Sequence, residues 1–378
     1  MRLAIVTTHP IQYYAPLFKL LAAKVELMVF YTWGQASVTK HDPGFGKTIQ
    51  WDIDLLEGYP YQWVNNTAAH AGTHHFKGID TPNLINQINN WKPDTLLVYG
   101  WAYKSHLKVL RHFKNKIPVL FRGDSTLLDE QPGIKNLLRK IYLRWVYKHI
   151  DYALYTGTNN KAYFKKYGLT DKQLLFTPHT VDNERFALYR AKEVLQLKQQ
   201  LNIDPNAVVI LFAGKLEEKK APNLLLQAFI NLAQPSVHLL FVGDGALLSD
   251  LKQQASAQPN VHFMGFQNQR YMPVIYQACD VFCLPSKGPG ETWGLAVNEA
   301  MACGRAILVS NKVGCAVDLV EPAVNGYIFN ADNDITEKLG ALLSKTRQEL
   351  TLMGKASAQK IARWDFTTQV NSIVNYKK

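Results

Sequence analysis

The stretch VFCLPSKGPGETWGLAVNEAMACGRAILVS, residues 281–310, joins two apolar runs of strand length through a glycine-rich loop and an apolar segment of helical length. Gly288 and Gly290 in the loop allow the backbone to approach a ligand closely. A helix is predicted to start near Thr292 or Trp293, and the N–H groups of its first turn suit a diphosphate. The order of strand, helix and strand predicts one repeat of a parallel sheet covered by helices.

The same alternation extends over the whole chain. Runs of strand length are LAIVTT, VELMVFY, TLLVYG, VLFRG and YALYTG in the first half, then VVILFAG, LLFVGDG, VHFMGF, VFCLPS, AILVS and YIF. They predict an α/β protein of two doubly wound, Rossmann-like domains, whose strands end at a shared cleft. The predicted domains are residues 1–182 and 183–356. Residues 357–378 form a predicted helix that either packs on the second domain or crosses back to the first.

The composition is that of an ordinary globular protein, with 378 residues of which 47% are hydrophobic and 19% charged. The amino terminus lacks the apolar region of a signal peptide, and no run approaches the ~20 apolar residues that span a bilayer. We therefore expect a cytoplasmic protein. The net charge of +12 predicts an anionic partner, which could be nucleic acid, acidic lipid or a phosphorylated substrate. The four cysteines lack C-x-x-C spacing and are expected to be reduced core thiols.

Two glutamates follow the apolar run of the opening stretch. Glu291 lies in the loop, whereas Glu299 lies in the helix among apolar residues and is predicted to be buried. A buried carboxylate needs partners, and about 12 Å of helix rise separates the two residues. We predict that the pair holds one elongated ligand, with a sugar hydroxyl at Glu291 and a ribose at Glu299. A structural Glu–Lys pair is the alternative explanation for Glu299.

A second group of candidates follows the first strand of the second half, in FAGKLEEKKAP. Gly214 ends the strand, and Lys215 and Lys220 come after it. Two cations at a strand end can neutralise a leaving diphosphate, on which charge builds in the transition state of glycosyl transfer. A solvated run of charges is the alternative.

At these residues the sequence resembles the GT-B glycosyltransferases, specifically the retaining family four. The resemblance rests on Gly214-Lys215-Leu216 with Lys220, on Val242-Gly243-Asp244-Gly245, on Gly265-Phe266, on Glu291 with Glu299, and on SNKVGCAVDLVEPAVNGYIF. The first half resembles a subgroup of that family through HPIQYYAPLF, WDIDLLEGY, FRGDS and VDNERF. The resemblance implies a hexosyltransferase of surface polysaccharide biosynthesis. It would retain the anomeric configuration without a metal ion, by same-face attack assisted by the leaving phosphate.

The resemblance also implies a UDP-sugar or GDP-sugar donor, a glycan or lipid-linked acceptor, and no separate cofactor. The implied donor site consists of Gly214, Lys215, Lys220, Phe266, Gly290, Glu291, Thr292, Trp293, Gly294, Leu295 and Glu299. Glu291 and Lys220 are candidate catalytic residues, and His9 and Asp124 join them by position, with Arg122 beside Asp124. The family often has Arg where this chain has Lys215, and a structural role for His9 stays open.

Four features bear on rival functions. Asp52-Ile53-Asp54 has the Asp-x-Asp pattern of metal-dependent glycosyltransferases, and VGDGALL contains only part of a dinucleotide-binding motif. A nucleotide-sugar epimerase or a glycan phosphorylase would share the architecture. A basic module that binds nucleic acid would explain the charge, but it leaves the glutamate pair unexplained, and the sequence contains no recognised nucleic-acid module.

The stretch IKNLLRKIYLRWVYKHI, residues 134–150, suggests an amphipathic helix. Leu137, Leu138, Ile141, Trp145 and Val146 are predicted to lie on one side, and basic residues cover the rest. This pattern fits a helix on an anionic membrane surface, which would make the protein peripheral to the inner face of the membrane. It fits a helix that faces the protein core equally well, and both interpretations stay open.

Overall fold

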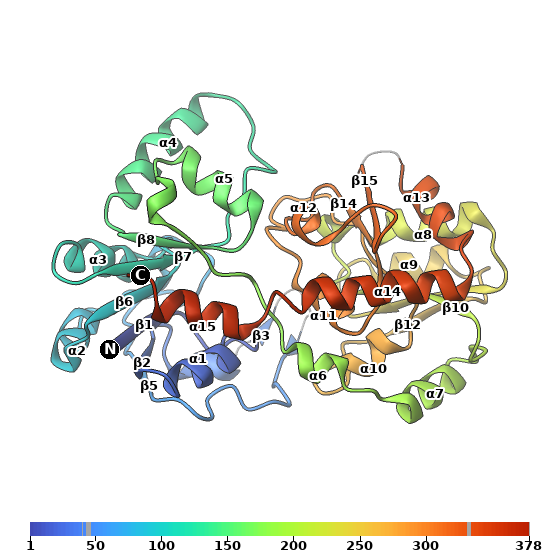
Figure 1. Ribbon diagram of the computed structural model, residues 1–378, viewed down its shortest axis with the longest axis horizontal. Coiled ribbons are helices and arrows are strands. Elements are labelled where there is room, and N and C mark those ends of the chain that lie inside the picture. The colour runs from blue at the N-terminus through green and yellow to red at the C-terminus, as the bar shows by residue number, and fades with distance from the viewer. Residues whose placement is uncertain (40, 43–46, 331–333, 378) are drawn as a thin grey trace. The chain divides into compact units, whose positions relative to one another are not determined.

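The chain folds into two compact units in the computed structural model, which describes residues 1–39, 41–42, 47–330 and 334–377 (Figure 1). Unit 1 comprises Met1–Lys40, Ile53–Pro178 and Phe366–Lys378, and unit 2 comprises His41–Asp52 and His179–Asp365. Each unit contains one parallel sheet with helices, which confirms the predicted fold class. No helix in the described ranges is both long enough and apolar enough to cross a membrane.

The sheet of unit 1 has seven parallel strands. Their order is β5 (Tyr61–Trp63), β2 (Glu26–Tyr31), β1 (Arg2–Thr7), β6 (Thr95–Tyr99), β7 (Val119–Arg122), β8 (Tyr152–Tyr155) and β9 (Leu174–Phe176). The chain winds outward from β1 in one direction and then in the other, as a doubly wound sheet requires. The two short edge strands, β5 and β9, were not predicted from the sequence, because three residues carry too little periodicity.

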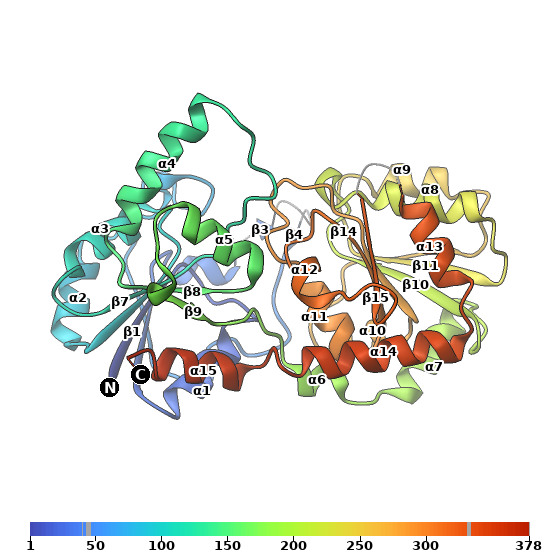
Figure 2. The same cartoon turned by 45° about the horizontal axis from the view of Figure 1, so that its top comes forward.

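Helices cover both faces of this sheet because alternate residues of each strand point to opposite sides. Ala4 and Val6 of β1 pack with α2 (Leu84–Trp91), α3 (Lys104–Phe113), α4 (Ile134–Tyr147) and α5 (Thr158–Lys166). Leu3 and Ile5 pack on the other face with α1 (Ala15–Ala22) and α15 (Phe366–Val374). Figure 2 shows α15 alongside α1, so the end of the chain completes the core of unit 1.

The sheet of unit 2 has six parallel strands. Their order is β12 (Val261–Met264), β11 (Val237–Val242), β10 (Val208–Ala213), β13 (Val281–Leu284), β14 (Ala306–Ser310) and β15 (Gly326–Phe329). One face packs against α8 (Pro222–Leu232), α9 (Leu248–Gln254), α13 (Ile335–Leu343) and part of α14 (Arg347–Ile361). Phe282 points to the other face, where its ring lies 5.5 Å from that of Tyr276 in α10 (Met272–Gln277).

The remaining elements are short or connect the sheets. They are α6 (Asn183–Ala187), α7 (Ala191–Gln200), α11 (Leu295–Ala302), α12 (Ala316–Leu319), the 3-10 turns η1 (Gln35–Thr39), η2 (Phe76–Gly78), η3 (Asp171–Gln173) and η4 (Glu218–Lys220), and the antiparallel pair β3 (His41–Asp42) and β4 (Lys47–Thr48). Two helices, α11 and α4, correct the sequence prediction in detail. Helix α11 begins at Leu295 rather than at Thr292 or Trp293, because Gly294 adopts a left-handed conformation before it. In α4, Val146 is buried and does not share the exposed face with Leu137.

We predict that Ile373→Ala lowers the free energy of unfolding of unit 1 by about 2–5 kcal/mol, the usual cost of a cavity at a buried isoleucine. Ile373 is 0% exposed in α15. Leu352→Ala is the control, since Leu352 is 57% exposed in α14 and its truncation should change stability by only about 0.5 kcal/mol. Urea denaturation measures both variants. Equal stability of the two would contradict the place of α15 in the core.

Candidate functional site

A cluster of polar side chains lies beyond the carboxyl ends of β10 and β13, which are neighbours in the sheet of unit 2. The Lys220 ammonium, at the end of η4, donates a hydrogen bond to the carboxylate of Glu291. The Ser286 hydroxyl donates to the same carboxylate oxygen over 2.8 Å. The side chain of Glu291 is 10% exposed and that of Lys220 is 21% exposed, so the ion pair is shielded but within reach of a ligand.

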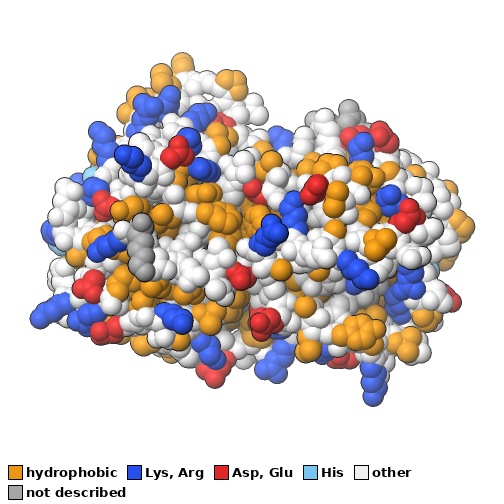
Figure 3. Space-filling model, in the orientation of Figure 1, with side chains coloured by type: hydrophobic (Ala, Val, Ile, Leu, Met, Phe, Trp, Pro, Cys, Tyr) orange, Lys and Arg blue, Asp and Glu red, His pale blue; other side chains and the backbone are white. Residues whose placement is uncertain are grey.

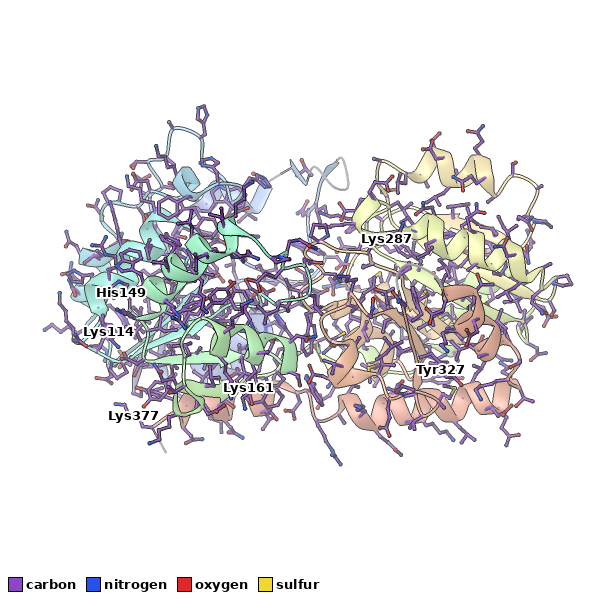
Figure 4. All side chains as sticks on the ribbon, turned by 90° about the horizontal axis from the view of Figure 1, so that it is seen from above. Lys114, His149, Lys161, Lys287, Tyr327 and Lys377 are labelled. Carbon is purple, nitrogen blue, oxygen red and sulfur yellow. The ribbon has the colours of Figure 1, made fainter. Side chains whose placement is uncertain are left out.

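The backbone also joins the two loops that carry this cluster. The N–H of Lys287, a residue labelled in Figure 4, donates to the carbonyl of Lys219 over 3.0 Å. Lys219 is the direct neighbour of Lys220, and Lys287 follows Ser286. The sequence-predicted residues Lys220 and Glu291 are therefore held together by side chains and by backbone. Ser286 was missed from the sequence, although its place two residues after β13 is a usable signal.

The start of α11 is held by a close contact between two backbone segments. A Cβ atom on Gly314 would lie 1.8 Å from the carbonyl oxygen of Thr292, so only glycine fits there. The N–H of Gly314 donates to the carbonyl of Glu291 over 3.0 Å, and the N–H of Cys315 donates to that of Trp293 over 2.9 Å. Gly294 precedes the helix with φ 99°, a conformation that favours glycine. These contacts determine where the first turn of α11 points.

Glu299 is buried in α11, as the apolar sequence around it predicted, with 3% of its surface exposed. The Tyr276 hydroxyl donates a hydrogen bond to Oε2 of Glu299 over 2.7 Å. This bond fixes one carboxylate oxygen and hence the direction of the other. A Lys–Glu ion pair, the structural alternative considered for Glu299, is found at Glu291. Tyr276 had no signal in the sequence because it lies on another helix.

A second buried network holds the base of α11. The indole N–H of Trp293 donates to Oδ1 of Asn298 over 2.9 Å, and Nδ2 of Asn298 donates to the carbonyl of His179 over 3.0 Å. The rings of His179 and Trp293 lie 5.6 Å apart. Asn298 is 0% exposed, so its amide needs both partners. Asn298 could have been identified from the sequence, because it is a polar residue within a largely apolar helix.

The other donor-site candidates lie on the loops after β10, β11 and β12, which Asp244 connects. The carbonyl of Asp244 accepts from the N–H of Leu216 over 3.0 Å, and its carboxylate accepts from the N–H of Phe266 over 3.1 Å. Gly214 and Lys215 directly precede Leu216 on the first of these loops. The structure thus gathers Gly214, Lys215 and Phe266 at the same sheet edge as Lys220 and Glu291.

The first-half candidates belong to unit 1. His9 follows β1, where Nδ1 lies 2.8 Å from the Thr8 hydroxyl and the ring meets that of Trp33 at 5.3 Å. Arg122 is 4% exposed and donates to the carbonyls of Thr177 and Pro178, which indicates a structural role. Burial lowers the pKa of this guanidinium.

Asp124 lies just beyond β7 and is exposed. Its charge adds to burial in raising the pKa of the Tyr14 phenol, so the two side chains share one electrostatic environment. Burial also raises the pKa of Tyr99 to about 12, and the rings of Tyr14 and Tyr99 lie 4.7 Å apart. Asp124 therefore stands at the edge of an aromatic cluster of unit 1.

The Asp-x-Asp motif is engaged in backbone hydrogen bonds. Asp52 accepts from the N–H of Arg270 at 3.1 and 3.2 Å, and Asp54 accepts from the N–H of Leu56 at 2.9 Å. Within the described ranges, no group of three or more His, Cys, Asp or Glu side chains has the arrangement of a metal site. The four cysteines are buried free thiols, as predicted, and burial raises the pKa of Cys279 to about 12.

Residues 194–360 match the model of the family described as glycosyl transferases group 1. A D-inositol 3-phosphate glycosyltransferase of Segniliparus rotundus is 27% identical over 219 residues, which cover 55% of this chain and 47% of the relative. An N,N'-diacetylbacillosaminyl-diphospho-undecaprenol alpha-1,3-N-acetylgalactosaminyltransferase of Campylobacter jejuni is 26% identical. The alignment covers 66% of this chain and 68% of that relative.

A UDP-Gal:alpha-D-GlcNAc-diphosphoundecaprenol alpha-1,3-galactosyltransferase of Escherichia coli is 34% identical over 49% of this chain and 48% of its own. The chain thus spans about half the length of two of these three curated relatives. Among solved structures, Anabaena HepE in complex with UDP-glucose superposes with a TM-score of 0.72 at 18% identity, covering 100% of this chain and 99% of its own. WaaG, a glycosyltransferase involved in lipopolysaccharide biosynthesis, superposes with a TM-score of 0.67 at 14% identity, and the superposition covers 99% of each chain. These likenesses establish the GT-B fold.

We predict that Gly314→Ala displaces the loop before α11, because the added methyl group would meet the Thr292 carbonyl. The variant should lose at least about 1–3 kcal/mol of stability, the range for overpacking, and its binding of any ligand of this loop should weaken. Thermal unfolding measures the loss. Gly72→Ala is the control, since its nearest neighbour would be a His74 carbon at 3.9 Å. Comparable unfolding temperatures for both variants would argue against a close contact between Gly314 and the Thr292 carbonyl.

Proposed function

Because residues 194–360 match the model of the glycosyl transferases group 1, we propose that the chain belongs to this family and transfers a hexose-type sugar from a nucleotide diphosphate sugar to a glycan or lipid-linked acceptor. The observation that carries this proposal is the cluster of Lys220, Glu291 and Ser286 at the carboxyl ends of β10 and β13. It lies within the matched residues 194–360, and open α/β sheets bind their ligands at this edge.

The donor would extend along the loop and helix that the Gly314 contact positions. We assign its diphosphate to Lys215, Lys220 and the backbone of residues 290–295, which leads into the first turn of α11, and the N-terminus of a helix favours bound anions. Glu291 would accept from the sugar hydroxyls and Glu299 from the ribose. The two carboxylates suit different tasks, because Glu291 is within reach of solvent while Glu299 is buried and held by Tyr276.

Transfer breaks the bond between the anomeric carbon and the leaving phosphate and forms a bond to an acceptor hydroxyl. In the retaining reaction that we propose, the acceptor attacks on the same face, and its proton passes to the leaving phosphate oxygen. Negative charge grows on that phosphate, and the ammonium groups of Lys215 and Lys220 would stabilise it. Lys220 is paired with Glu291 in the described structure, so the incoming donor would share this cation with the carboxylate.

For the donor base and the acceptor, the curated relatives supply the support. The name of the Escherichia coli relative contains UDP-Gal and a diphosphoundecaprenol carrier, and that of the Campylobacter jejuni relative contains a diphospho-undecaprenol carrier. We therefore propose a UDP-sugar donor, a lipid-linked acceptor and a role in surface polysaccharide biosynthesis at the cytoplasmic face of the membrane. His9 and Asp124 of unit 1 are the candidates for contact with the acceptor.

Two assays test the function directly. Thermal-shift screening against UDP-sugars and GDP-sugars identifies the donor, since a ligand that binds the folded state raises its stability. Release of nucleoside diphosphate is then measured with and without a lipid-linked acceptor. Release that needs the acceptor supports transfer, whereas conversion of the sugar nucleotide without release would establish an epimerase.

Removal of metal ions should leave the activity unchanged, because Asp52 and Asp54 already accept backbone hydrogen bonds. The measurement compares turnover before and after dialysis against EDTA. Loss of turnover followed by recovery with manganese would establish a metal-dependent transferase and overturn this assignment.

Substitutions of Lys220 and Glu299 should affect different constants, kcat for the first and the dissociation constant of the donor for the second. We predict that Lys220→Ala lowers kcat about 100-fold, because the cation acts on charge that develops during transfer. Glu299→Gln should instead raise the dissociation constant of the donor about 10-fold, through a weakened hydrogen bond to the ribose. Lys219→Ala is the matched control, since its ammonium pairs with Glu217 at 3.3 Å and is 47% exposed. Donor binding and kcat like those of the wild type in both site variants would refute the site.

A further inference from the structure

Helix α4 of unit 1 has two apolar faces, of which only one is covered. Leu143, Val146 and Tyr147 are at most 3% exposed and pack into the core. The other face consists of Ile134 at 80% exposure, Leu137 at 60%, Leu138 at 63%, Ile141 at 61%, Tyr142 at 40% and Trp145 at 38%. A continuous group of six large apolar side chains in water is rare on a soluble domain and usually marks an interaction surface.

The charged residues of α4 border this exposed face on both sides. At about 100° per residue, the six apolar side chains occupy an arc of roughly 140°, opposite the buried seam. Lys135 and Arg139 lie along one border of the arc, and Lys140 and Arg144 lie along the other. The helix contains no acidic residue. Figure 3 shows hydrophobic and basic side chains together where α4 lies in Figure 1.

Aromatic rings and a further cation extend the surface at the carboxyl end of α4. The rings of Tyr142 and Trp145 lie 5.7 Å apart, and Trp145 also meets His149, labelled in Figure 4, at 5.2 Å. The Arg111 guanidinium from α3 lies 5.4 Å from the Trp145 ring. Tyrosine and tryptophan with nearby cations are typical of the boundary between lipid headgroups and acyl chains.

We propose that α4 docks on an anionic lipid surface. Its apolar arc enters the boundary below the headgroups, and Lys135, Lys140 and Arg144 contact lipid phosphates. The core-facing residues Leu143 and Val146 keep the helix attached to unit 1, so insertion requires no unfolding. A helix with an apolar face between two basic borders lies in the membrane plane rather than across it.

The basic residues of α4 disfavour two other partners for this surface, a second copy of the chain and a nucleic acid. In a symmetric contact between two copies of the chain, the basic borders of one α4 would meet those of the other, with no acidic residue in either helix. A nucleic acid would neutralise the cations but leave the apolar arc in water. An anionic bilayer is the partner that satisfies both the arc and its borders.

Lipid binding needs neither donor nor turnover, so it stands or falls independently of the proposed transferase activity. The measurement is co-sedimentation at low salt with vesicles of phosphatidylcholine, with and without phosphatidylglycerol. The unmodified protein should bind the anionic vesicles, and added salt should release much of it. Absence of binding to anionic vesicles at low salt would overturn the proposal.

Two double variants separate the apolar and basic contributions. Leu138→Gln with Ile141→Gln should weaken binding at least about 10-fold, because both side chains are exposed and their loss removes inserted surface without disturbing the core. Lys135→Gln with Lys140→Gln should weaken binding to anionic vesicles about 10-fold. Leu352→Gln, exposed at 57% in α14, is the control and should bind like the unmodified protein. Unchanged binding in the leucine–isoleucine variant, or a dimer in sedimentation that this variant abolishes, would refute the lipid-docking role.

Discussion

The arrangement of the proposed donor site depends on one close backbone contact, in which Gly314 lies against the carbonyl of Thr292. Two hydrogen bonds from residues 314 and 315 hold the loop that contains Glu291 and Trp293. Because no side chain fits between these segments, the loop has one position, and α11 starts from it in one direction. The location of Glu299, the fifth residue of α11, follows from that start.

The two glutamates experience different physical environments, which explains how one loop and helix can serve two purposes. Glu291 is shared between an ammonium and a hydroxyl near the surface, where a ligand can compete for the same partners. Glu299 is buried, and the hydrogen bond from Tyr276 holds one of its carboxylate oxygens in place. Asn298 beside it is equally buried, and it stabilises the helix through Trp293 and the His179 carbonyl.

The basic residues of unit 1 occupy two different environments. Arg122, the last residue of β7, is buried and donates hydrogen bonds to backbone carbonyls, so it stabilises this end of the strand. The basic residues of α4 are exposed and border an apolar surface. The proposed lipid-docking surface and the proposed donor site would thus each use a small group of the basic residues of the chain.

The sequence by itself determined the parallel α/β fold, the two sheets, the buried state of Glu299 and the strand-end position of Lys220 and Glu291. These follow from local periodicity and from the rule that loops after parallel strands share one edge. Only the tertiary structure decided the partners, since Tyr276 and Gly314 reach the site from other segments. Ser286 lies in the same loop as Glu291, and only the folding of that loop brings the two side chains together. It also decided which apolar side of α4 is covered, because one helical pattern fits a core or a lipid surface until the neighbouring elements are in place.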